Sequence, residues 1–217
     1  MGSFRLYRKY TQSLDSSGFT LIELLVVLAI IGAISTIVLT SQSSFNKTLV
    51  LANTAYDIAL TLRSAENFGL GSRALGTNAN AGYGLHFDSG TTGSFMLFAD
   101  IWPATDLVCT RPDCKPGDHL YSPTDALVRT YTLGNGIVVS DFCAFSSGGW
   151  RCAATGDLST LDIVFSRPNP DAFINANGST FTSYSAACLT ITSPQKTSRF
   201  ISVAASGQII ANAPSCP

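Results

Sequence analysis

The sequence predicts an α+β fold, in which a long N-terminal α-helix packs on a head of antiparallel β-sheet. Two observations predict it. No proline occurs before Pro103, and residues 41–68 contain no glycine either, so nothing in that stretch breaks a helix before Gly69. After Gly71 the sequence pattern changes to short runs of β-branched and aromatic residues between turn signals. A single long helix followed by consecutive strands indicates α+β rather than alternating α/β architecture.

The helix is expected to begin in a membrane-spanning segment. Residues 19–39 contain one charged side chain, and a helix needs about 20 apolar residues to cross a bilayer. The run is too long for the apolar region of an ordinary signal peptide, which has about 7–15 residues. Residues 1–18 carry Arg5, Arg8 and Lys9 against Asp15, which places the N-terminus in the cytoplasm and the head outside it.

Glu23 is the charged residue in this segment. A carboxylate in the bilayer costs roughly 2.5 kcal/mol or more near the helix centre, so such groups usually have a partner. The simplest alternative is a carboxylate that reaches the interface near the helix end. With residues 1–18 attached, Glu23 has no evident partner. Cleavage between Gly18 and Phe19 would create an α-amine, and a neighbouring subunit's ammonium group could then pair with Glu23.

The second half of the helix is predicted to be amphipathic and to end near Gly69 and Gly71. From residue 19 to about 70 it would run ~78 Å at 1.5 Å per residue. Polar residues 41–44 mark the point where it leaves the membrane. The stripe expected to lie on the head has helical spacing and consists of Phe45, Leu49, Ala52, Tyr56, Ala59 and Arg63, broadened by Leu60.

The head is predicted to consist of strands joined by tight turns. Residues 134–136 (Gly-Asn-Gly) predict a hairpin. Residues 90–93 and 177–179 are interpreted as further hairpin signals. Residues 102–125, rich in proline and charge, are expected to form an exposed loop. The predicted strands are residues 82–88, 94–100, 126–133, 136–145, 161–166, 171–176, 186–192 and 199–212.

Six cysteines, all in the second half of the chain, indicate a disulfide framework in an oxidising compartment. Buried free thiols are the alternative. Six cysteines allow 15 pairings. Proximity in the sequence favours Cys109–Cys114, Cys143–Cys152 and Cys188–Cys216, the last of which would hold the final strand.

Enzyme and cofactor signatures are absent from the sequence, so no catalytic residue, cofactor or metal is predicted. The two histidines are His86, expected to face solvent from a strand, and His119. Cys109, Cys114 and His119 lack the tight spacing of zinc ligands, and exported cysteines oxidise. Residues 88–93 are interpreted as a turn, and a calcium site there is the less favoured alternative. Trp102 and Trp150 are read as packing on disulfides, with an adhesive tip as the alternative.

Charge argues against a nucleic-acid partner. Residues 71–217 contain eight Lys or Arg residues and ten Asp residues, without a basic run. A net charge of −2 gives no general attraction to phosphate, although folding can still gather a local basic patch.

The stretch SSGFTLIELLVVLAIIGAI, residues 16–34, resembles the class III signal sequence of type IV prepilins and pseudopilins. The resemblance implies cleavage after Gly18 and N-methylation of Phe19 by a prepilin peptidase. It further implies assembly with other pilin or pseudopilin subunits through an inner-membrane platform, and contact with membrane lipid before assembly. Thr40 stands where major pilins usually have a helix-kinking proline, which is more typical of a pseudopilin or minor pilin.

The predicted layout of helix, two packed sheets and a C-terminal strand resembles the GspH/FimT pseudopilins. Residues 202–210, SVAASGQII, are similar to a segment in which that family often has Ser-Gly-Arg. Gln208 replaces the arginine, which argues against DNA binding of the kind some members show.

Together these observations predict a non-enzymatic filament subunit, a minor pilin or pseudopilin. Its parts are a cleaved leader (1–18), a long helix (19–70) and a disulfide-bearing head (71–217). A type II secretion pseudopilin is the alternative within the class. A membrane-anchored adhesive ectodomain is the alternative outside it.

Overall fold

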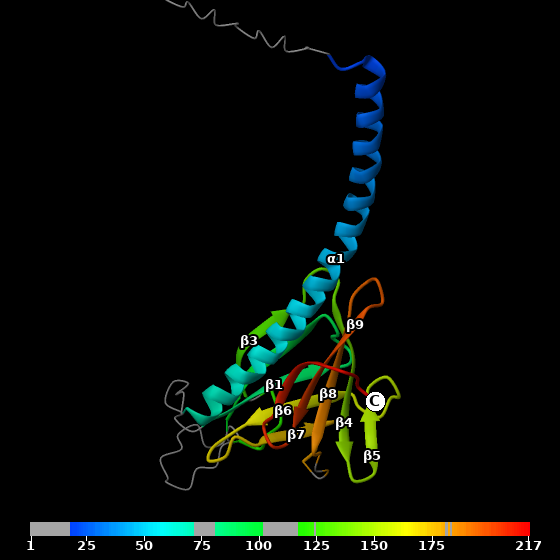
Figure 1. Ribbon diagram of the computed structural model, residues 1–217. Helices are drawn as coiled ribbons and strands as arrows, with labels where there is room; N and C mark the ends of the chain where they lie inside the picture. The colour runs from blue at the N-terminus through cyan, green and yellow to red at the C-terminus, as the bar shows by residue number, and fades with distance from the viewer. Residues whose placement is uncertain (1–17, 72–80, 102–116, 124, 181, 183) are drawn as a thin grey trace, which may run out of the picture. The chain divides into compact units, whose positions relative to one another are not determined.

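The computed structural model describes residues 18–71, 81–101, 117–123, 125–180, 182 and 184–217 (Figure 1). It divides into two compact units, residues 1–44 and 45–217, which are described separately. One helix and ten strands make up the described part: α1 (Leu21–Leu70), β1 (Gly82–Asp88), β2 (Ser94–Asp100), β3 (Ala126–Thr132), β4 (Val138–Ser146), β5 (Gly149–Cys152), β6 (Thr160–Phe165), β7 (Ala172–Ala176), β8 (Ala186–Thr192), β9 (Ser198–Ala204) and β10 (Ile209–Ala213). The predicted α+β fold class is confirmed.

Helix α1 ends at Leu70, between two glycines that have different roles. The N–H of Gly71 donates to the carbonyl oxygen of Asn67 (2.9 Å), which closes the last turn. At Gly69 the helix backbone lies so close to the carbonyl of Phe165 in β6 that an added Cβ would collide with it. Glycine therefore stops the helix and also allows it to approach the sheet.

The strands form two five-stranded antiparallel sheets. Sheet 1 has the order β3-β2-β1-β6-β7, and sheet 2 has the order β10-β9-β8-β4-β5. Figure 1 shows that β1–β3 come first along the chain, β4 and β5 belong to the other sheet, and β6 and β7 return to the first. The chain therefore passes between the sheets three times, after β3, β5 and β7.

The hairpins predicted at residues 134–136 and 177–179 were wrong, because the chain passes to the other sheet at both places. Asn135 and Gly136 have φ of 57° and 68°, and Asn177 and Gly178 have φ of 57° and 62°, so both turns form as their residues indicate. However, β3 and β4 lie in different sheets, as do β7 and β8. Turn residues determine the local change of direction, whereas burial of the strands decides which of them pair. The hairpin expected around residues 90–93 does form, between β1 and β2.

The last predicted strand, residues 199–212, is in fact two strands. β9 and β10 pair antiparallel, with Ile209 opposite Val203. Gly207 lies in the turn between them with φ of 80°, and a Cβ there would collide with the carbonyl of Pro170. The apolar residues on both sides of Gly207 were interpreted as one continuous strand, so this turn was not predicted. Strand β5, four residues long, was also missed.

The stripe predicted to bind α1 to the head was also wrong. Leu49, Tyr56 and Leu60 are 45%, 53% and 63% exposed. The buried residues follow the same helical spacing on another face: Leu51, Ala55, Ile58, Leu62 and Ala65, each at most 1% exposed. Both faces carry apolar side chains, so periodicity alone does not distinguish them. Of the predicted stripe, Ala59 is buried at 8% exposure.

A matched pair of leucines tests this assignment of the buried face. Leu62→Ala is expected to lower the free energy of unfolding of the head by about 2–5 kcal/mol, because it leaves a cavity in the core. Leu60→Ala, two residues away, is expected to change it by about 0.5 kcal/mol or less. Urea unfolding of the full chain in detergent measures both. Equal losses would contradict the assignment.

Both faces of sheet 1 are covered. Tyr83, Leu85 and Phe87 of β1 point into the single apolar core shared with α1 and sheet 2. The alternate residues point the other way, onto what we call the outer face of sheet 1: Gly84, His86, Met96, Phe98, Asp100, Asp162, Val164, Phe173 and Asn175. Residues 117–123 contact this face. His86 is 7% exposed there, so its predicted solvent exposure was wrong.

Candidate functional site

The N-terminal end of α1 is closed by hydrogen bonds between Thr20 and Glu23. The N–H of Glu23 donates to Thr20 Oγ1 (3.3 Å), while the N–H and hydroxyl of Thr20 donate to Glu23 Oε2 (3.4 and 3.3 Å). This is a capping box, with Thr20 at the N-cap and Glu23 at the third helical position. The sequence reading that gave Glu23 no partner was therefore wrong. The Thr-x-x-Glu pattern was the signal that could have revealed it.

The apolar segment that follows meets the size criterion for a membrane span. Leu21–Leu39 has a mean hydropathy of 2.7, and none of it is buried within the described chain. Glu23 is the acidic residue of the first helical turn, where the positive end of the helix dipole favours a carboxylate. Gly18 and Phe19 lie directly before this turn, and Phe19 is 84% exposed. The described segment thus combines an exposed apolar surface with one anionic side chain near its N-terminal end.

The outer face of sheet 1 contains a buried ion-pairing group. His86 Nδ1 lies 2.6 Å from Asp162 Oδ1, and the Asp162 side chain is 1% exposed. The Tyr121 ring covers His86 with a centroid separation of 4.5 Å. Burial raises the pKa of Asp162, while the hydrogen bond from His86 opposes that rise. The contact between His86 and Asp162 connects β1 to β6.

Two further carboxylates attach the 117–125 segment to sheet 1. Asp100, 0% exposed, accepts the backbone N–H groups of Asp118 (3.1 Å) and His119 (2.9 Å). Asp125 accepts the N–H of Ile101 (3.0 Å) and both the N–H and the hydroxyl of Ser122 (2.6 and 2.9 Å). Burial raises the pKa of Asp125, and it raises that of Asp100 to about 7, with like charge from Asp125 and Asp118 adding to the rise.

Asp100 should make the head less stable as pH rises. Its carboxyl holds a proton in the folded head up to about pH 7 but loses it near 3.8 when unfolded. The folded state therefore binds more protons between these values, and the free energy of unfolding falls from pH 4 to pH 7. Asp100→Asn is expected to flatten this slope, as measured by urea unfolding at several pH values. An unchanged slope would mean that other titratable groups cause the pH dependence of the free energy of unfolding.

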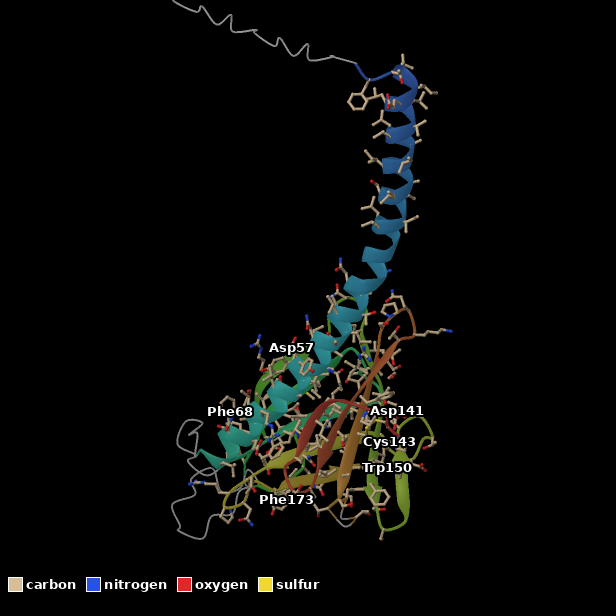
Figure 2. The ribbon with its side chains drawn as sticks, viewed as in Figure 1. Asp57, Phe68, Asp141, Cys143, Trp150 and Phe173 are labelled. Carbon is tan, nitrogen blue, oxygen red and sulfur yellow. A yellow bond between two sulfur atoms is a disulfide. The ribbon has the colours of Figure 1, made fainter. Side chains whose placement is uncertain are left out.

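Along β7, at the edge of sheet 1, lies a groove of about 550 Å³. One wall is β7 with His119, whose ring stacks on Phe173 at 3.7 Å and 4°. Figure 2 labels Phe173 on this strand. The opposite wall comes from the connection to β8 and from the β9–β10 turn. The described residues that line the groove are His119, Asp171, Ala172, Phe173, Ile174, Asn175, Thr180, Tyr184, Ala205 and Ser206.

Two disulfides hold sheet 2. Cys143 in β4 is bonded to Cys152 in β5, and Cys188 in β8 is bonded to Cys216 after β10. These are the pairings that sequence proximity favoured, and the second holds the C-terminal tail to the sheet. The third pair, Cys109–Cys114, lies outside the described residues, as does Trp102.

Asp141 lies close to Cys143 and Cys152, within ligand distance of a common metal ion, but both sulfurs are engaged in the disulfide. Their bond removes the thiolates that a metal would need. Trp150, labelled with these residues in Figure 2, is 39% exposed and packs on Phe145 at 5.2 Å. The contact that the structure shows for Trp150 is with Phe145, so its predicted packing on a disulfide stays a prediction.

Comparison with protein families identifies the N-terminal segment. Residues 14–39 match the family described as the prokaryotic N-terminal methylation motif. No curated protein and no solved structure was found to match the chain. The motif is the class III signal, and together with the apolar helix and the α+β head it supports a type IV pilin-like protein. It indicates a structural subunit and a membrane anchor at the N-terminus.

Proposed function

We propose that this type IV pilin-like chain is a minor pilin or pseudopilin, a subunit that a prepilin peptidase processes and that enters a filament through its apolar helix. The match of residues 14–39 to the methylation motif carries the proposal. Cleavage falls between Gly18 and Phe19, and Phe19 becomes the methylated N-terminal residue. Residues 1–18 are then the leader, 19–70 the assembly helix and 71–217 the exported head.

The exposed surface of Leu21–Leu39 supports this role. Such a surface needs lipid before assembly, or other apolar helices after it. Glu23 would then leave its capping bond with Thr20 or share it, and accept the ammonium group of a neighbouring subunit. Neutralising two charges at once favours assembled over separate helices in a medium of low dielectric constant. The partners are the peptidase, an inner-membrane platform and other pilin or pseudopilin subunits.

The absence of proline before Pro103 favours a minor pilin or pseudopilin over a major pilin. A type II secretion pseudopilin would need the same leader and helix, and the two roles differ in where the processed chain is found. An anchored adhesive ectodomain would use the helix only to hold the head at the membrane.

One experiment separates these roles. Surface filaments are sheared from the native cells, and filament and membrane fractions are analysed by non-reducing peptide mass spectrometry. We expect chains that begin at N-methyl-Phe19, are disulfide-bonded and are present in the filaments. Processed chains confined to membranes would favour the secretion pseudopilin. Chains that retain residues 1–18 in cells with an active prepilin peptidase would overturn the proposal and favour the anchored ectodomain.

A further inference from the structure

Strand β7 has a free edge with an unused hydrogen-bonding position. In an antiparallel pair the N–H and C=O groups of successive residues point alternately toward and away from the partner strand. The N–H of Asn177 donates to the carbonyl oxygen of Thr160, the first residue of β6 (3.1 Å), so residues 175 and 173 also direct their backbone groups toward β6. Ala172, Ile174 and Ala176 therefore direct theirs away from the sheet.

Both ends of this edge are occupied, but its middle is not. The N–H of Ala172 donates to Ala205 (2.8 Å), and the C=O of Ala176 accepts from Ser179 (3.1 Å). The N–H and C=O of Ile174 have no hydrogen-bond partner among the described residues, and Ile174 lines the groove. Backbone groups left open at the edge of a sheet can pair with a strand of another chain.

The walls of the groove also include a largely buried polar side chain. Tyr184 lines the groove and is 6% exposed. A volume of about 550 Å³ is in the range of ligand sites. Because Ala205 and Ser179 occupy the two ends of the edge, an incoming segment would pair with β7 at Ile174 alone.

The charge of the groove selects among such chains. Asp171 at its rim is exposed and forms no ion pair with another described residue. Burial lowers the pKa of His119, so that ring is neutral at pH 7 and does not offset the Asp171 charge. The described lining therefore carries a net negative charge, which favours a basic side chain in the occupant.

We propose that the groove along β7 binds a short extended segment of another polypeptide, which adds to sheet 1 as a strand through the backbone of Ile174. A basic residue of that segment pairs with Asp171, and a polar group of it bonds to the hydroxyl of Tyr184. Strand addition of this kind takes its affinity from the main chain and its selectivity from side-chain contacts. It does not depend on whether the protein is a pilus or a secretion subunit.

The test uses the full chain in detergent micelles and the peptide acetyl-Thr-Val-Lys-Val-Thr-amide. Two further versions carry backbone N-methyl groups on alternate residues. We expect the parent peptide to bind and to slow hydrogen exchange at the Ile174 amide. One N-methylated version should lose binding and the other should keep it, because only alternate residues face β7. Exchanging Lys for Glu should weaken binding about twofold to fivefold.

Two tryptophan variants locate the binding site. Ser206→Trp, in the β9–β10 turn, is expected to fill the groove and abolish binding. Ser89→Trp, an exposed serine in the β1–β2 turn outside the groove, is the matched control and should bind as the parent chain does. Asp171→Asn should remove the preference for Lys over Glu, while binding of both peptides remains.

Three results would overturn the proposal. The first is the absence of peptide binding in the millimolar range. The second is equal binding of both N-methylated peptides, which would mean recognition by side chains alone. The third is an Ile174 amide already protected in the free chain and exposed by deleting residues 104–114, because the occupant would then be the chain's own segment.

Discussion

Replacing Glu23 with alanine is expected to leave cleavage after Gly18 intact and to reduce incorporation of the chain into filaments about tenfold or more. The expected size follows from an unpaired ammonium group in an apolar assembly, since 1.4 kcal/mol already changes an equilibrium tenfold. The ratio of the processed chain in sheared filaments to that in membranes, measured by quantitative mass spectrometry, gives the effect. Normal incorporation of the variant would remove the pairing role of Glu23.

The capping box provides controls that separate charge from helix capping. Glutamine at the third helical position still hydrogen-bonds to the N-cap residue, so Glu23→Gln removes the charge and keeps the cap. Thr20→Val does the reverse, because it removes the hydroxyl that caps the helix and keeps the carboxylate. If Glu23 acts by pairing with an ammonium group, Glu23→Gln behaves like Glu23→Ala, and Thr20→Val incorporates normally. The opposite pattern would assign Glu23 to helix capping.

Asp162→Ala is expected to lower the free energy of unfolding of the head by about 3–5 kcal/mol, the usual cost of removing one member of a buried pair. The change leaves His86 Nδ1 without its partner beneath Tyr121, where the His86 side chain is 9% exposed. Urea unfolding of the full chain in detergent at pH 7 measures the loss. Asp162→Asn should cost less, since an amide can still hydrogen-bond to the imidazole.

Asp57→Ala is the matched control for Asp162→Ala. Asp57, labelled in Figure 2, is an exposed acid on α1, and its removal should change the free energy of unfolding by about 0.5 kcal/mol or less. A similarly small loss for Asp162→Ala would show that the His86–Asp162 contact contributes little to the head.

The sequence predicted where α1 begins and ends better than how it faces the head. The limits follow from local chemistry, because proline is absent, Thr20 caps one end and Gly69 closes the other. The buried face follows from tertiary packing. Leu60 and Leu62 are both leucines in a helix, and only the shape of the surface beneath α1 determines that Leu62 is buried.

The same distinction holds for the strands. Short runs of β-branched and aromatic residues between turn signals located most of them, yet turn residues did not reveal that the strand after Gly136 joins the other sheet. Nor did the sequence reveal a strand break within the apolar run around Gly207. Pairing is a property of distant segments, so it cannot be inferred from a local turn.

The N-terminal candidate residues, Gly18, Phe19 and Glu23, were inferred from a short linear pattern. Such a pattern can be recognised without knowledge of the fold. The acids on the outer face of sheet 1 could not be found in this way. Asp100 and Asp162 lie far apart in the sequence and come to the same face only when β1, β2 and β6 pair. The groove along β7 could not be predicted either, because it depends on which strand forms the edge of sheet 1.

The interleaving of the two sheets has a consequence for the order of folding. Strand β1 pairs with β6, more than 70 residues later, and β4 pairs with β8, across the β6–β7 segment. Neither sheet can be completed from a continuous stretch of chain, so loop closure must precede most of the stabilising contacts. A nascent chain therefore acquires its core only after residue 192 is available, and the head should then fold late and in a single cooperative step.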